Sequence, residues 1–214
     1  MAKITVAKNA GYCYGVRRAI EKAQGCAKAG EGPVYTAGPL IHNKFVVSQL
    51  EGQGIYSRDT IEAIPDGAQV VVRAHGITRQ QQEQLEQKGC RTVDAPCPHV
   101  ARIHRIVEEE SAKGRHILII GSRAHPEVVG IASRCGQHTV LENLEEVAEF
   151  IKNLEEKPLS VVAQTTFNRE IFVNCTNLLK NTCKSIGIFD TICNATDERQ
   201  REARILAAES DAVI

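Results

Sequence analysis

Three of the eight cysteines stand in the same kind of position, after a strand-like run and directly before a helix-like run. They are Cys13, Cys97 and Cys193, and an aspartate precedes the second and the third of them by three residues. The start of a helix favours negative charge, so a thiolate is stabilised there. Thiolates bind metals and attack electrophiles, and cysteine thiolates are the usual ligands of iron–sulfur clusters. These positions therefore point to metal or redox chemistry.

The spacing of these cysteines, 84 and 96 residues, equals about one small α/β lobe each. We infer a repeated unit in which each lobe delivers one thiol to a common centre. Three thiolates would leave one iron of a cubane cluster open for a substrate oxygen. No C-x-x-C pair occurs, which weighs against zinc ribbons and thioredoxin-like or ferredoxin-type motifs. The alternative is that the three cysteines only cap helices and pack, as we expect of Cys26, Cys90, Cys135, Cys175 and Cys183.

Polar residues follow three of the apolar runs. The tripeptide Arg-Ala-His occurs twice, 50 residues apart, and ends at His75 and at His125. Glu127 follows the second histidine by two residues, and a third apolar run leads into Gln164-Thr165-Thr166. Because functional loops gather at the carboxyl ends of parallel strands, these side chains are candidates for one shared site. Each of them taken alone would more often be structural.

The composition excludes several functions. Lysine plus arginine and aspartate plus glutamate both number 26 in the 214 residues, so no basic excess favours nucleic acid or an anionic membrane as a partner. The N-terminal residues lack the apolar core of a signal peptide, and no apolar run approaches the ~18 residues of a membrane-spanning helix. We therefore expect a cytoplasmic protein whose thiols stay reduced.

Short apolar runs alternate with amphipathic segments along the chain. The runs at 70–72, 117–120 and 160–163 are typical of strands in a parallel sheet that is covered on both faces. This alternation predicts an α/β fold with right-handed crossovers. We expect an N-terminal strand with the first cysteine at 1–13, α/β lobes at 14–97 and 98–193, and the start of an incomplete third lobe at 194–214, with a helix at 199–209.

Several motifs in a fixed order carry a resemblance to a known family. They are residues 10–19 around Cys13, Gly38-Pro39-Leu40-Ile41-His42-Asn43, Arg73-Ala74-His75-Gly76, Asp94-Ala95-Pro96-Cys97-Pro98, His125-Pro126-Glu127, Gln164-Thr165-Thr166 and Cys193-Asn194-Ala195-Thr196. Together they cover essentially the whole chain. The sequence resembles the 4-hydroxy-3-methylbut-2-enyl diphosphate reductases, iron–sulfur enzymes that complete the methylerythritol phosphate route to isoprenoids.

The resemblance implies a trefoil of three α/β lobes around a central 4Fe-4S cluster. Its ligands would be Cys13, Cys97 and Cys193, with one iron open. The substrate-binding residues implied by the family are His42, His75, His125 and Thr165, of which His42 and His75 would bind the diphosphate. Glu127 would supply or relay a proton. The remaining histidines match no family motif, and we expect surface or packing roles for them: His99, His104, His116 and His138. For Arg17, Arg18 and Arg73 we expect solvated or helix-dipole roles rather than phosphate binding.

The reaction implied is reductive dehydroxylation of the allylic diphosphate to isopentenyl and dimethylallyl diphosphate, with ferredoxin or flavodoxin as the electron donor. The family continues beyond residue 214, so we expect a truncated third lobe and little or no turnover by this chain alone. Two alternatives stay open. One is a non-catalytic cluster-binding fragment or redox sensor of the same fold. The other is a different three-cysteine cluster enzyme, such as a quinolinate-synthase-like dehydratase, which lacks support from the His-Pro-Glu and Gln-Thr-Thr segments.

Overall fold

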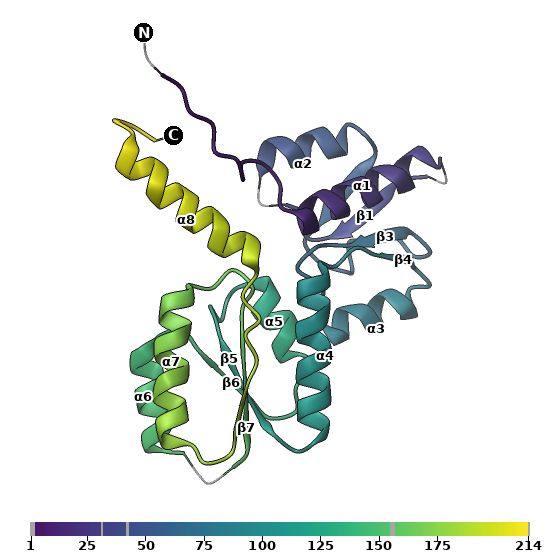
Figure 1. Ribbon diagram of the computed structural model, residues 1–214. Coiled ribbons are helices and arrows are strands. Elements are labelled where there is room, and N and C mark those ends of the chain that lie inside the picture. The colour runs from purple at the N-terminus through teal and green to yellow at the C-terminus, as the bar shows by residue number, and fades with distance from the viewer. Residues whose placement is uncertain (1–2, 31, 42, 155–156, 214) are drawn as a thin grey trace.

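Two parallel β-sheets with helices on their faces make up most of the chain in a computed structural model, which describes residues 3–30, 32–41, 43–154 and 157–213 (Figure 1). In chain order the elements are α1 (Tyr14–Lys28), β1 (Val34–Ala37), α2 (Lys44–Glu51), β2 (Ile55–Arg58), β3 (Gln69–Val72), α3 (Arg79–Gln87), β4 (Arg91–Asp94), α4 (Pro98–Ala112), β5 (His116–Ile120), α5 (Pro126–Ala132), β6 (His138–Leu141), α6 (Leu144–Lys152), β7 (Leu159–Ala163), α7 (Arg169–Thr182), β8 (Ile186–Ile188) and α8 (Asn194–Glu209).

Both sheets have four strands and the same topology. The strand orders are β2-β1-β3-β4 and β6-β5-β7-β8, and every described pair is parallel. In each sheet the first strand in sequence lies between the second and the third. The α/β class expected from the alternation of apolar runs and amphipathic segments is confirmed.

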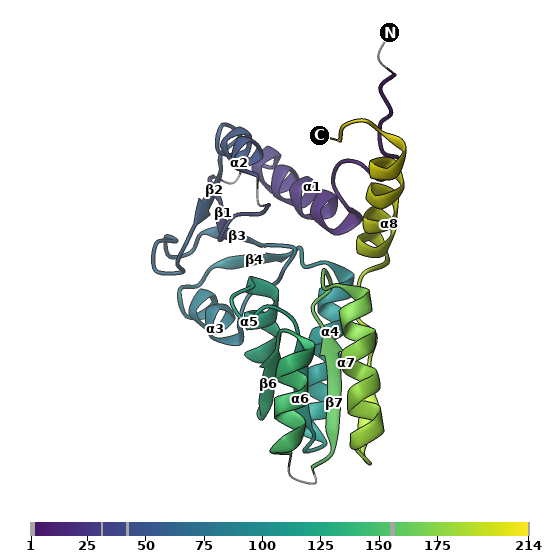
Figure 2. The same cartoon turned by 90° about the vertical axis from the view of Figure 1, so that its left-hand side faces the viewer.

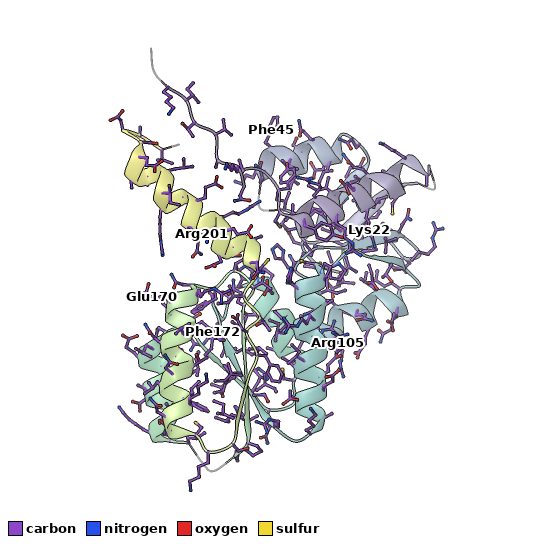
Figure 3. All side chains as sticks on the ribbon, viewed as in Figure 1. Lys22, Phe45, Arg105, Glu170, Phe172 and Arg201 are labelled. Carbon is purple, nitrogen blue, oxygen red and sulfur yellow. The ribbon has the colours of Figure 1, made fainter. Side chains whose placement is uncertain are left out.

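The central strands of the second sheet, β5 and β7, are mainly apolar because helices cover both faces of the sheet. Leu118 and Ile120 of β5 pack with residues of α6 and α7, whereas Ile117 and Ile119 pack with residues of α4 and α5. Phe172 from α7 belongs to the first of these cores, and Figure 3 shows it between that helix and the sheet. Removing each such side chain from water contributes roughly 1.5–3 kcal/mol. The first sheet is enclosed in the same way, by α1 and α2 on one face and by α3 on the other.

The helix α4 joins the two lobes. It begins at Pro98, four residues after β4 ends at Asp94, and its apolar side packs against the second sheet (Figure 2). Proline suits the first position of a helix because the N–H that it lacks would have no partner there. Cys97 consequently lies at the point where one lobe ends and the other begins.

The two ends of the described chain lie side by side outside the sheets. The backbone N–H groups of Lys8 and Asn9 donate to the carboxylate of Glu202 on α8, at 2.5 and 2.9 Å, and Arg199 donates to the carbonyl of Gly11 (Figures 1 and 2). The strand expected at residues 4–6 is not formed, since no described strand lies beside it, and Ile4 is 87% exposed.

The last described helix is longer than expected. It starts at Asn194, directly after Cys193, rather than at residue 199, and none of its described residues is buried. No described helix combines the length and the apolar character that crossing a membrane requires.

Candidate functional site

The three candidate thiols occupy equivalent places at the starts of helices. Cys13, Cys97 and Cys193 are the N-cap residues of α1, α4 and α8, and each has extended backbone angles. Burial raises the pKa of Cys97, and the charges of Cys193 and Cys13 raise it further, whereas the backbone at the start of α4 lowers it. The mutual effect of the thiols on this pKa means that the fold brings all three sulfur atoms into one neighbourhood.

A glycine allows α1 to approach Cys97 closely. A Cβ atom added at Gly15 would lie 2.7 Å from Cys97 Sγ, inside the contact distance of any real Cβ atom. Gly15 is the second residue of α1, so the helix that begins after Cys13 touches the thiol that begins α4. Only a residue without a side chain lets these two helix starts meet.

Replacing Gly15 with Ala is therefore expected to displace the Cys97 thiol while the chain stays folded. The matched control is Gly25→Ala in the same helix, where an added Cβ has no neighbour within 4 Å and alanine improves helix propensity by up to about 1 kcal/mol. The reaction rate of Cys97 with a maleimide, measured by peptide mass spectrometry, should change several-fold in the first variant and stay unchanged in the second. Equal rates in the two variants would contradict the close contact.

Two of the thiols are anchored to the polar loops at strand ends. The backbone N–H of Cys97 donates to the carbonyl of Ala74 at 3.0 Å, and that of Cys193 donates to the carbonyl of Thr165 at 2.8 Å. Thr165 is itself a candidate site residue, and Ala74 directly precedes another candidate, His75. The thiols and the polar strand ends thus belong to one site.

A buried carboxyl group lies in this site. Glu127 is 1% exposed, and its Oε1 and Oε2 atoms are each 2.6 Å from Thr165, at the backbone nitrogen and the hydroxyl respectively. Burial raises the pKa of Glu127, and the two contacts with Thr165 oppose that rise without cancelling it. Such a carboxyl group holds its proton at higher pH than an exposed glutamate does, as a general acid must.

Two histidines from different lobes meet beside this carboxyl group. His125 is the N-cap of α5, and its Nδ1 atom accepts the backbone N–H of Glu127 at 3.2 Å. The ring of His75, which follows β3, lies edge-on to the ring of His125 with 5.7 Å between centroids. An Nδ1 atom that accepts a hydrogen bond leaves Nε2 to carry the proton of a neutral ring. The loop after β3 and the start of α5 together present two imidazoles.

The third histidine expected in the site, His42, lies outside the described residues. Its neighbour Asn43 caps α2, accepting the backbone N–H groups of Phe45 and Val46 at Oδ1. Among the described residues, no group of three histidines, cysteines or acidic residues is arranged to hold a single metal ion.

Arg18 and Arg73, for which solvated or helix-dipole roles were expected, make specific contacts with other segments, as Lys22 also does. Arg73 is half-buried above Gly38: an added Cβ there would lie 2.5 Å from its Nη1 atom. Its Nε atom donates to the carbonyl of Gly76 within the loop after β3, and its packing above Gly38 brings this loop against the loop after β1. Arg18 and Lys22 on α1 donate to the carbonyls of Pro96 and Asp94, just ahead of Cys97 (Figure 3 labels Lys22). The positive φ of +77° at Gly38 requires glycine, but the sequence does not show which side chain lies above it.

The fold and the site define an α/β protein of two like lobes that gathers three helix-starting thiols, a buried carboxyl group and paired histidines at the carboxyl ends of its strands. A family model described as "LytB protein" matches residues 4–214. The chain belongs to this family.

Relatives and solved structures agree with this assignment. The 4-hydroxy-3-methylbut-2-enyl diphosphate reductase of Clostridioides difficile is 37% identical over 211 residues, which are 99% of this chain and 76% of that protein. The enzyme of the same name from Aquifex aeolicus is 36% identical over 218 residues, 100% of this chain and 74% of its own length.

A solved structure of (E)-4-hydroxy-3-methyl-but-2-enyl diphosphate reductase, titled as the terminal enzyme of the non-mevalonate pathway, superposes with a TM-score of 0.82 at 36% identity and covers 99% of this chain and 75% of the other. The Plasmodium falciparum reductase structure gives a TM-score of 0.85 at 31% identity, covering 94% and 64%. The resemblance to a reductase family that the sequence motifs indicated is thereby confirmed, and this chain spans about three quarters of the length of most of these relatives.

Proposed function

We propose that this protein catalyses the reductive dehydroxylation of 4-hydroxy-3-methylbut-2-enyl diphosphate to isopentenyl and dimethylallyl diphosphate. In this reaction two electrons and two protons convert the allylic C–O bond to C–H, and water leaves. The observation that carries the proposal is the buried Glu127 carboxyl group, held by Thr165 beside His125 in a site that also contains the three thiols. The buried acid can supply protons, and the thiols are of the kind that bind iron–sulfur clusters, which supply electrons. Both are needed for a reaction that consumes protons and electrons.

Cys13, Cys97 and Cys193 would hold a 4Fe-4S cluster. The charges of Cys13 and Cys193 act on the pKa of Cys97, which supports a place for all three sulfur atoms in one neighbourhood. This pattern fits a cluster, because each cysteine ligand of a cluster binds a different iron atom. When bound, the cluster supplies single electrons and, at its iron without a cysteine, Lewis acidity.

The proton chemistry would belong to Glu127 and Thr165. Burial raises the pKa of this carboxyl group, so it holds its proton to higher pH than an exposed glutamate does, and its 2.6 Å contact with the Thr165 hydroxyl would make that hydroxyl a relay between the acid and the substrate. A protonated carboxyl group donates to the hydroxyl, which is then free to donate in turn. The departing hydroxyl group would receive this proton and leave as water.

The diphosphate would be bound by His42 and His75, and His125 would also reach the substrate. Imidazoles donate one hydrogen bond each when neutral and two when charged, so a few of them bind an anion without making the whole protein basic. The formal net charge of zero agrees with such a localised arrangement. A cytoplasmic ferredoxin or flavodoxin would supply the electrons.

The test is anaerobic turnover of the allylic diphosphate with reduced methyl viologen, followed by detection of the two C5 diphosphates. Any turnover should yield both products, and Glu127→Gln should lower the rate at which they form by about 10²–10⁴-fold. A chain that carries the cluster and binds inorganic diphosphate but forms no product would instead be a non-catalytic cluster-binding relative. The exposure of α8, none of whose described residues is buried, is the observation that favours this second candidate.

A further inference from the structure

A small cavity with both polar and apolar lining lies where the two lobes meet. Its volume is about 70 Å³, and residues from both lobes line it, among them Gly76, Asp94, His104 and Arg134. His104 comes from α4 and is only 8% exposed. The cavity is large enough for one or two water molecules, each of which takes about 30 Å³ in the liquid.

Two buried nitrogen atoms belong to residues that line this cavity. His104 Nε2 and Arg134 Nε are both inaccessible to solvent, and neither makes a hydrogen bond with any described residue. The other nitrogen atoms of Arg134 are engaged, at Glu108 and at the carbonyl of Ile77. Native proteins pair almost all such buried polar atoms, with protein groups or with ordered water. Arg134 also lowers the pKa of His104, after the larger effect of burial, to about 4, so the ring is neutral at pH 7.

The ring of His104 also lies between two segments of the candidate site. One is the loop that carries His75, and the other is α5, which carries Glu127. A Cβ atom at Gly76 would lie 2.9 Å from His104 Cε1, and one at Gly130 would lie 3.7 Å from His104 Nε2. Gly76 directly follows His75, and Gly130 lies in α5 one turn after Glu127. Both segments therefore rest on this one imidazole.

Further bonds join the same two segments at the rim of the cavity. The backbone N–H of Arg79 donates to the hydroxyl of Ser133 at 3.1 Å, and that hydroxyl donates to the carbonyl of Gly130 at 2.7 Å. The guanidinium of Arg79 and that of Arg134 both contact Glu108 of α4. The joint between the lobes is thus a polar network with the cavity inside it.

We propose that the cavity is an internal hydrated site in which water bridges His104 Nε2 to Arg134 Nε, and that His104 is a positioning residue that sets the spacing between the loop of His75 and the helix of Glu127. A neutral imidazole serves this purpose because it fills the gap left by the glycines and still offers a polar atom to the water. The role of His104 in spacing the His75 loop from α5 is inferred from the packing of the two lobes alone. Only the expected effect on turnover rests on the proposed function.

The experiment compares His104→Gln, which keeps a polar group, with His104→Phe, which keeps a ring but has none. Amide hydrogen exchange is measured in the full chain for residues 74–78 and 126–133, with residues 169–182 of α7 as the folding control. We expect the Phe variant to exchange about 10-fold faster in both segments and the Gln variant to stay within about 3-fold of the parent, with α7 unchanged in both. The exposed His138→Phe is the matched control.

The water is tested by the nuclear Overhauser effect between a long-lived water and the His104 ring, which should be present in the parent chain. Equal exchange in the Phe variant and the parent, equal effects of Phe and Gln, or a ring without a water contact would each overturn the proposal. Arg134→Met provides a second variant, in which the water contact should also be lost. In cluster-loaded protein that turns over, His104→Phe should lower kcat about 10-fold at unchanged iron content. A parent chain without turnover would count against the proposed function and leave the exchange result standing.

Discussion

Changing Glu127 to Gln should lower turnover by about 10²–10⁴-fold, the range that a general acid contributes, while iron content and fold are retained. The amide is similar in size and keeps the contacts with Thr165, but it has no acidic proton to deliver. The measurement is kcat under anaerobic conditions, with circular dichroism and iron content for each variant. The exposed Glu109→Gln on α4 is the control and should behave as the parent chain does.

The pH profile separates an acid from a merely structural carboxyl group. Burial raises the pKa of Glu127, so the protonated form persists above the usual range of glutamate and is lost as the pH rises through the raised value. Activity should therefore fall on the alkaline side in the parent chain, and this limb should vanish in Glu127→Gln. A parent-like rate in the Gln variant, or an alkaline limb that survives in it, would remove Glu127 from the proton path.

Changing Cys97 to Ser should abolish cluster binding and with it all turnover. Cys97 lies at the joint of the lobes, where the other two thiols act on its pKa and where α1 touches its sulfur. Serine keeps the shape, but its hydroxyl is a much poorer ligand for iron than a thiolate is. The measurement is iron and sulfide per chain, together with the visible absorption of the cluster.

Cys135→Ser provides the control for that experiment. Burial raises the pKa of Cys135 to about 12, and its Sγ atom donates to the carbonyl of Ile131, so this thiol is a packing group. Its replacement should leave the iron content unchanged, although it removes a thiol from the neighbouring lobe. Equal iron content in the Cys97 and Cys135 variants would mean that Cys97 is not a ligand.

Local sequence patterns were sufficient for the elements of the fold. The run at 117–120 is apolar throughout because α4, α5, α6 and α7 cover both faces of its sheet, and its period and length identify a buried parallel strand. Cys97 and His125 could be placed at helix starts because a proline follows each of them in sequence. The repeated Arg-Ala-His tripeptide correctly indicated two histidines that meet, although they belong to different lobes.

Features that depend on contacts between distant segments could not be predicted in this way. The strand expected at residues 4–6 needs a neighbouring strand, and the described residues provide none. The position of Arg73 above Gly38 and the cavity beside His104 result from packing between loops that follow different strands. The sequence around His104 shows only a histidine on an amphipathic helix, which left a surface and a packing role open, and the structure buries the ring.

The most direct test of the account is a count of iron and acid-labile sulfide in the parent chain purified without oxygen. If the thiols of Cys13, Cys97 and Cys193 converge on one cluster, each chain should carry about four iron and four sulfide, and a variant with all three changed to Ser should carry none. A parent chain without iron, or a triple variant that keeps it, would contradict the account.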